Sequence, residues 1–346
     1  MPRYVPGARG AQGTTPIKVS SNENPYDPLP SVAAAIARAA LAINRYPDMF
    51  CTELGALIAE RHGVTAERVV VGAGSVALLG HAIQAFCGPS DEVVYAWRSF
   101  EAYPILTQIA GAQPVRVPLG SGARHDLPAL AAAVGPATRV VLVCSPNNPT
   151  GPAVGAAEFE AFMEALPPTI LVVLDEAYGE FVRDPGAVKG LDVLTLHPNV
   201  LVIRTFSKAY GLAGLRVGYG MGHPDVVAAI RACVTPFSVS GVAQAAAVAS
   251  LAAEAELLER VEEIVAERDR LLNALREQGW SPPDAQGNFF WIPAGTDADA
   301  LAAYLMAGDP PILARPFSGE GVRITVGSVA ENDAVLRLLA SYPSRF

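Results

Sequence analysis

The chain has 346 residues, of which 51% are hydrophobic and 17% charged, and its formal net charge is −9 at pH 7. This composition excludes a disordered or coiled-coil protein, and the acidic balance argues against partners such as nucleic acid or anionic membranes. Because the length exceeds the size at which one hydrophobic core stops growing, we expect one large domain and a smaller one.

The amino-terminal sequence and the cysteines indicate the compartment. The first sixteen residues contain no apolar signal segment, and the longest strongly apolar run, TILVVL, is far shorter than the roughly 20 residues that cross a bilayer. The cysteines are far apart and show no CxxC spacing, which is typical of free thiols; they are Cys51, Cys87, Cys144 and Cys233. We expect a cytoplasmic protein without a membrane segment. The five histidines show no metal-binding spacing, so we expect no metal site.

Short apolar runs alternate with segments of helical period from residue 68 to about 220. The runs are RVVVG, DEVVYAW, QPVRVP, RVVLVCSP, TILVVLDEA, VLVIRTF and LRVGY. Continuous apolar runs bounded by Gly, Pro, Asn or Asp are typical of strands that are buried on both faces. This alternation predicts an α/β fold with a mostly parallel, seven-stranded sheet between helices, and ligands bind such sheets at the carboxyl ends of the strands.

The remaining sequence predicts a long helix and a small α+β domain. Residues 241 to about 278 contain no proline, repeat apolar residues at spacings of three and four, and end at a glycine, as expected for a helix with at most one break. The runs NFFWIP, ILARPF and VRITV follow, together with two helical segments. We therefore predict an N-terminal arm that packs with the small domain (1–30), a large domain (31–240), and a linking helix with the small C-terminal domain (241–346).

One glycine motif has two interpretations. VVVGAGSVALLG contains GxGxxA at Gly72, Gly74 and Ala77, and Asp91 follows nineteen residues after Gly72, as in a dinucleotide fingerprint. The acid of that fingerprint should end the second strand, however, whereas Asp91 precedes a predicted strand. We therefore prefer a glycine turn and a helix whose backbone N–H groups at Gly74 and Ser75 can hold a phosphate.

Lys208 follows a predicted strand in TFSKAYGLAGLRVGY, at the edge where ligands bind. Taken alone, such a lysine is usually solvated, but an apolar, glycine-lined pocket lowers its pKa and makes it a nucleophile towards carbonyls. Arg216 and the hydroxyls of Thr205 and Ser207 can form a second arm of a phosphate site. Together these residues suggest a ligand that carries an aldehyde and a phosphate.

Three more polar residues follow buried strands. Asp175 ends TILVVLD, where a carboxylate is costly without a cationic partner, so it either caps a turn or balances a buried, protonated ring nitrogen. Tyr178 either packs in the core or turns back to donate to a phenolate oxygen in the same pocket. Asn148, in CSPNNPTG, either belongs to a turn or hydrogen-bonds a ligand.

The motifs SPNNPTG, LDEAY and TFSKAYGLAGLRVGY, in this order and spacing, resemble the fold-type-I pyridoxal-phosphate aminotransferases of the aspartate aminotransferase superfamily. The resemblance covers nearly the whole chain. SNENPY, NRYPD, ARPF and GVRITVG are similar to the histidinol-phosphate aminotransferase branch in particular. The resemblance implies pyridoxal 5′-phosphate as the cofactor and a homodimer with shared active sites.

The resemblance also implies a role for each matching residue. Lys208 would bind the cofactor's aldehyde carbon covalently and later move the substrate's α-proton, and Asp175 would keep the ring nitrogen protonated. Asn148 and Tyr178 would hold the phenolic oxygen, and Phe100 would stack on the ring. The phosphate would be held by Gly74, Ser75, Thr205, Ser207 and Arg216, with Tyr46 reaching in from the second subunit.

The substrate is expected to meet a second set of residues. Arg323, in GVRITVG, would bind the α-carboxylate through a bidentate fork, although without the resemblance it would be only an arginine at a strand edge. Arg315, in ARPF, either reaches the substrate or has a structural role. Asn24 and Tyr26 of SNENPY complete the expected substrate-binding set.

Two segments depart from the histidinol-phosphate pattern. AWRSFEAYP and PFSVS instead resemble the aromatic amino acid (phenylalanine) aminotransferases of the same branch. Trp97, Phe100 and Phe237 could add apolar area for a benzyl group, and Glu101 would oppose a phosphate dianion if it faced the pocket. We therefore expect ping-pong transfer of the amino group of phenylalanine, tyrosine or tryptophan to 2-oxoglutarate.

Two alternatives to this function are retained, and a third is not favoured. Histidinol-phosphate aminotransferase of histidine biosynthesis is the first, and a pyridoxal-phosphate decarboxylase of a phosphorylated amino acid is the second. A cofactor-binding transcription regulator would need a basic DNA-binding module, and the 67 residues before the first predicted strand show none.

Overall fold

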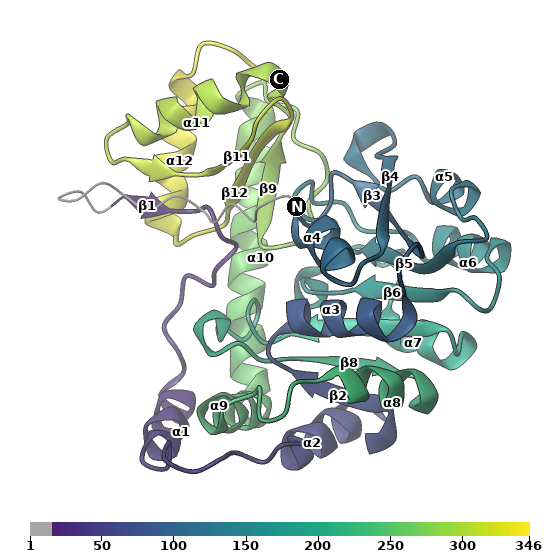
Figure 1. The fold of residues 1–346 in the computed structure, drawn as a ribbon. Helices are drawn as coiled ribbons and strands as arrows, with labels where there is room; N and C mark the ends of the chain where they lie inside the picture. The colour runs from purple at the N-terminus through teal and green to yellow at the C-terminus, as the bar shows by residue number, and fades with distance from the viewer. Residues whose placement is uncertain (1–15) are drawn as a thin grey trace.

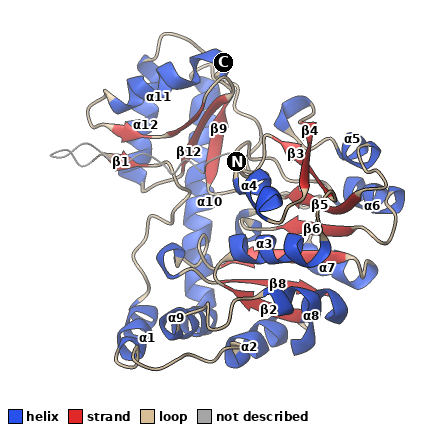
Figure 2. Ribbon diagram, in the orientation of Figure 1, coloured by secondary structure: helices blue, strands red, loops and turns tan. Residues whose placement is uncertain are grey.

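The computed structural model describes residues 16–346, so the first fifteen residues of the predicted N-terminal arm lie outside the described residues. Its main sheet has seven strands in the order β2-β8-β7-β6-β5-β3-β4. Only β8 runs in the direction opposite to the other six strands, so the predicted mostly parallel sheet between helices is confirmed (Figures 1 and 2). The strands are β2 (Val69–Gly72), β3 (Glu92–Trp97), β4 (Gln113–Pro118), β5 (Thr138–Cys144), β6 (Leu171–Asp175), β7 (Val200–Thr205) and β8 (Gly218–Gly222).

Apart from the edge strand β4, which is largely exposed or half-buried, the strands are buried on both faces, as their apolar runs predict. Alternate residues face opposite ways: Leu171 and Val173 pack in one core with α3 (Ser75–Phe86), α4 (Ala102–Ile109) and α8 (Pro224–Cys233). Val172 and Leu174 pack in the other core, with α6 (Ala156–Ala165) and α7 (Gly190–Leu196). The helix α5 (Leu127–Ala132) lies beside α6. The same alternation turns Asp175, at the end of β6, towards α4.

The predicted long helix is broken once. It consists of α9 (Gly241–Ala252) and α10 (Glu254–Glu277), which meet at an angle of 82°. Figure 1 shows α10 running from the large sheet to the small one, while α9 packs against α1 (Pro30–Ala40) and α2 (Thr52–His62). Among the described helices, none alone is long and apolar enough to cross a membrane; α9 and α10 meet that criterion only as a bent pair.

The carboxyl-terminal part forms a small α+β unit. Antiparallel strands β9 (Phe289–Ile292), β11 (Arg315–Phe317) and β12 (Gly321–Thr325) form its sheet, with helices α11 (Ala298–Met306) and α12 (Val329–Ser341). The strand β1 (Ile17–Lys18), which sequence analysis did not predict, pairs with β10 (Ile312–Leu313) of this unit. Short 3₁₀ turns occupy Ala66–Arg68, Ser121–Ala123, Gly179–Phe181, Ala213–Leu215 and Gly295–Asp297. The domain boundaries at residues 30 and 240 stay predictions.

Candidate active site

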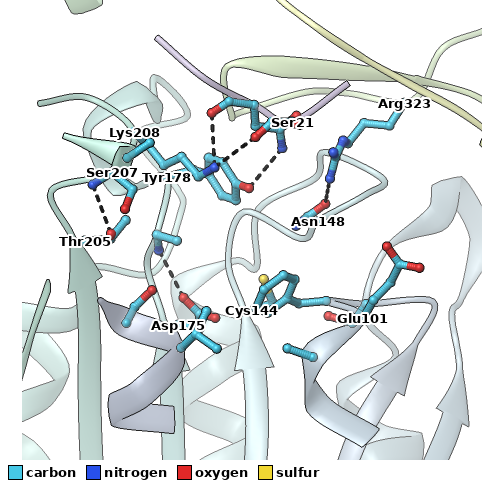
Figure 3. A pocket seen from close by; sticks show the side chains of 18 of the residues that line it. Ser21, Glu101, Cys144, Asn148, Asp175, Tyr178, Thr205, Ser207, Lys208 and Arg323 are labelled. Carbon is cyan, nitrogen blue, oxygen red and sulfur yellow. Dashed lines mark hydrogen bonds between the residues drawn. The ribbon is translucent and has the colours of Figure 1, made fainter. Parts of the chain in front are cut away.

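A cavity of about 490 Å³ lies where β5, β6 and β7 end, with β11 and β12 on its other side (Figure 3). This is the edge of the sheet at which the sequence predicts a ligand site. Most of the predicted site residues line the cavity; they are Ser75, Phe100, Asn148, Asp175, Tyr178, Thr205, Ser207, Lys208, Arg216, Arg315 and Arg323.

The amine of Lys208 lies inside this cavity. Its Nζ atom donates hydrogen bonds to the backbone carbonyls of Ser21 and Asn22, at 3.2 and 3.1 Å. Burial lowers the pKa of the amine to about 7, and the positive charges of Arg323 and Arg216 act in the same direction. A substantial fraction of Lys208 is therefore neutral and nucleophilic at pH 7, as the sequence predicts for a lysine in an apolar pocket.

Asp175 places a buried carboxylate on the cavity floor. Its Oδ2 atom accepts a hydrogen bond from the hydroxyl of Tyr103 at 2.9 Å, and its Oδ1 atom accepts one from the amide of Ala177 at 3.2 Å. Burial raises the pKa of Asp175 to about 6, although these two hydrogen bonds oppose the shift. Within residues 16–346 the carboxylate forms no ion pair. A cation bound above it would remove most of the cost of its burial.

Besides the amine of Lys208 and the carboxylate of Asp175, the cavity has a part that suits a phosphate group. Ser75 is the first residue of α3, so its backbone N–H points out of the helix. The Arg216 guanidinium donates to the Ser207 hydroxyl at 3.3 Å, and the Thr205 hydroxyl accepts from the Ser207 amide at 3.0 Å. Gly74 lies directly behind Arg216, where a Cβ atom would collide with the guanidinium. An amide, two hydroxyls and one positive charge thus converge.

Tyr178 and Arg323 are held by residues that come from distant parts of the chain. The Tyr178 hydroxyl accepts a hydrogen bond from the amide of Asn22 at 2.9 Å. Arg323 donates to Asn148 Oδ1 and to the backbone carbonyl of Ser20, both at 2.6 Å. Asn22 itself is buried and takes a left-handed conformation with φ 52°, which asparagine tolerates better than most residues.

Two residues of this region were not singled out in the sequence, and two that were predicted to bind substrate lie beside the cavity rather than in its lining. Asn22 was missed although it belongs to the quoted SNENPY motif, and Tyr103 was missed although it lies in FEAYP. Asn24 and Tyr26 do not line the cavity: the Asn24 amide donates to the backbone carbonyl of Lys208 at 3.2 Å. Tyr26 donates to the carboxylate of Glu263 at 2.6 Å. Both hold the chain beside the cavity rather than face its interior.

The expected aromatic residues are also partly elsewhere. Phe100 lines the cavity, but Trp97 and Phe237 do not. Trp97 stacks with the guanidinium groups of Arg98 and Arg116, at 4.3 and 4.4 Å from its ring centroid. Phe237 packs against Tyr46, with ring centroids 4.7 Å apart, and Tyr46 is 84% exposed. The contact of Tyr46 with the site of a second subunit stays a prediction.

The dinucleotide interpretation finds no support in the structure. Asp91, which would have to contact a ribose, precedes β3 and therefore lies at the amino ends of the parallel strands. Its carboxylate accepts from the amide of Gly88 at 2.7 Å and pairs with Arg139 at 3.4 Å. The acid is thus engaged at the edge of the sheet opposite the cavity.

The cavity residues fit pyridoxal 5′-phosphate, the cofactor that the sequence resemblance implies. The buried carboxylate of Asp175 calls for a cation, which the protonated ring nitrogen of this cofactor would supply. The corner at Ser75, Ser207 and Arg216 matches its phosphate, and the amine of Lys208 matches its aldehyde.

Comparisons with known proteins identify the family of the chain. The sequence matches the family Aminotransferase class I and II over residues 14–339. It is 52% identical to a protein named aromatic amino acid aminotransferase from Streptomyces coelicolor, over 98% of this chain and 94% of that protein. For a protein of the same name from Thermobifida fusca, the identity is 53%, over 100% and 96%.

A solved structure matches the whole fold. The histidinol-phosphate aminotransferase of Sinorhizobium meliloti, solved in complex with pyridoxal-5′-phosphate, superposes with a TM-score of 0.87. It is 32% identical to this chain, and the match covers 94% of this chain and 89% of that one. With a family match over nearly its full length and a cavity of the matching chemistry, the chain belongs to the class I and II aminotransferases.

Proposed function

We propose that this aminotransferase moves the amino group of an aromatic amino acid (phenylalanine, tyrosine or tryptophan) to 2-oxoglutarate by a ping-pong mechanism. The observation that carries the proposal is an identity of about half, over nearly the whole chain, to proteins named aromatic amino acid aminotransferase. The cavity supports it, because Phe100, Ile105, Leu106 and Phe317 give its lining apolar surface for a ring.

Different residues of the cavity would bind different parts of the cofactor. When bound, pyridoxal 5′-phosphate supplies an aldehyde that takes up the amino group and a ring that accepts the electron pair of the α-carbon. The Ser75 amide, the Thr205 and Ser207 hydroxyls and the Arg216 guanidinium would hold its phosphate, and Asp175 its ring nitrogen. Phe100, Asn148 and Tyr178 would orient the ring and its phenolic oxygen.

Lys208 would then move the proton. With a pKa of about 7, its Nζ atom can accept a proton from the substrate's α-carbon and donate it to the cofactor's former aldehyde carbon. At neutral pH neither transfer carries a large free-energy cost. Arg323 would fix the substrate by its α-carboxylate, because a guanidinium can offer two parallel N–H groups. The backbone carbonyls of Ser21 and Asn22 keep the amine of Lys208 directed into the cavity.

A homodimer and a cytoplasmic location belong to the same proposal. Exposed apolar side chains gather on the segment from Leu41 to Phe50, and Phe237 packs beside them at Tyr46; the exposed residues include Leu41, Ile43, Tyr46, Met49, Phe50 and Phe237. Such exposed apolar residues are typical of an interface, which would place Tyr46 at the second subunit's site. The four cysteines are free thiols, which suits a reducing compartment.

The lowered pKa of Lys208 gives a pH dependence for cofactor capture. Only the neutral amine attacks an aldehyde, so the rate at which the apoprotein takes up pyridoxal phosphate should rise with pH and level off above a midpoint near 7. Trapping with borohydride at a series of pH values measures this rate. Arg323→Gln removes a repelling charge and should move the midpoint upward. A wild-type midpoint above pH 9 would contradict the burial argument.

The substrate is tested by single half-reactions of the holoenzyme. At equal concentration, phenylalanine should remove the absorption of the bound cofactor faster than histidinol phosphate does, with phenylpyruvate as the product. Addition of 2-oxoglutarate should then form glutamate. Faster reaction with histidinol phosphate would refute the aromatic assignment. Release of carbon dioxide without a keto acid would identify a decarboxylase instead.

A further inference from the structure

Arg315 and Arg323 lie directly opposite each other on the antiparallel strands β11 and β12. Residues in such register project from the same face of the sheet, and both arginines line the cavity. Two guanidinium groups at one site suit an anion with two negative charges better than a single carboxylate. The chain therefore carries the groups for a dianion site.

Glu101 forms an ion pair with one of these two arginines, Arg315. Its Oε2 atom lies 2.8 Å from Arg315 Nη2, and the two side chains are only 26% and 9% exposed. Glu101 also lines the cavity, and in the view of Figure 3 it stands across the cavity from Lys208. The pair joins the amino end of α4, in the large domain, to β11 of the small sheet.

The segment that carries Glu101 is itself fastened. The Ser99 hydroxyl donates to Asn147 Oδ1 at 2.7 Å, and the Asn147 amide donates to the backbone carbonyl of Arg98 at 3.1 Å. Arg98 also forms an ion pair with Glu320, in the turn between β11 and β12. The loop therefore cannot easily swing the Glu101 carboxylate away from Arg315.

We propose that Glu101 is a specificity-determining residue that restricts the anion site to one carboxylate. Its carboxylate neutralises the positive charge of Arg315 through the ion pair. A phosphate dianion in the cavity is therefore repelled by Glu101 and is not bound by a second arginine charge. This inference rests on the proposed function, and it names what that site rejects. Histidinol phosphate carries its phosphate ester where an amino acid carries the α-carboxylate, whereas histidine has the same imidazole and a carboxylate.

The test is Glu101→Gln in the holoenzyme, which removes the charge and keeps the shape. The ratio of kcat/KM for histidinol phosphate to that for histidine should rise by about 10-fold or more. The ratio of kcat/KM for phenylalanine to that for histidine should stay within about threefold of the wild-type ratio, because both substrates present a single carboxylate to Arg323. An unchanged ratio overturns the proposal.

Two matched variants separate charge from structure. The first variant, Glu320→Gln, breaks the ion pair between Arg98 and Glu320, and Glu320 does not line the cavity. The ratio of kcat/KM for histidinol phosphate to that for histidine should therefore stay at the wild-type value in this variant. Glu101→Asp keeps the charge and should retain the discrimination. A rise in either variant as large as that in Glu101→Gln would also overturn the proposal. The wild-type preference tests the proposed function separately, because the inference is measured as the change between variants.

Discussion

Replacing Lys208 with alanine should lower kcat by roughly 10⁴-fold or more, because under the proposed function the variant loses both the covalent attachment of the cofactor and the group that moves the α-proton. Among residues 16–346, no second lysine lines the cavity. The chain has only three lysines; Lys18 pairs with Glu23 at 2.8 Å, and Lys189 is exposed. Steady-state turnover of phenylalanine measures the loss.

Lys189→Ala is the matched control for this experiment. It removes an amine of the same kind from the exposed N-terminal boundary of α7, where it does not line the cavity. Its activity should remain within about twofold of the wild type, as expected for an exposed substitution. Turnover of Lys208→Ala within tenfold of the wild type would be incompatible with the proposed role.

Asp175→Asn should lower kcat by about 10²- to 10³-fold, because a neutral amide cannot balance a cationic ring nitrogen. The amide keeps the shape of the carboxylate, so the loss reports charge. The apoprotein should not lose stability at pH 7. Burial raises the pKa of the wild-type carboxyl to about 6, so the wild type must bury an ionised group at neutral pH and its stability falls as pH rises from about 4 to 6.

Tyr103→Phe distinguishes support of the carboxylate from its charge. The hydroxyl of Tyr103 donates to Asp175 at 2.9 Å, and its removal should cost about 10-fold in kcat, far less than Asp175→Asn. The absorption of the bound cofactor and thermal unfolding of the apoprotein check both variants. If Asp175→Asn destabilised the apoprotein while leaving kcat within threefold, the carboxylate would be structural.

The sheet and the position of the site follow from local sequence. The strands β5, β6 and β7 are mostly apolar runs followed by polar residues, so their carboxyl ends could be predicted to carry Asn148, Asp175 and Lys208. The start of β8 could not be predicted in this way. Arg216 has φ 57°, so the apolar run LRVGY begins in a turn and becomes a strand only at Gly218.

Contacts between distant segments could not be predicted from local pattern. Tyr103 reaches Asp175 over 72 positions, Glu101 reaches Arg315 over 214, and Asn22 reaches Thr325 over 303. Periodicity says which face of an element is buried, but it does not say which segments meet there. For the same reason the charge of Glu101 was recognised in the sequence, while its position in the cavity emerged only from the fold.

The aromatic residues show how proximity in sequence misleads. Trp97 ends β3, which lies between β4 at the edge of the sheet and β5, and its ring stacks with Arg98 and Arg116. The cavity is centred on the ends of the inner strands, so only Phe100, three residues later, reaches it. Phe237 follows α8 and packs with Tyr46 outside the cavity.

Borohydride reduction of the purified holoenzyme, followed by peptide mapping, identifies the amine that holds the cofactor. With three lysines in the chain, the site of attachment can be assigned without ambiguity. One pyridoxyl group per chain is expected, on the peptide that contains Lys208. A label on Lys18 or Lys189, or a holoenzyme that takes up no label, would contradict this expectation.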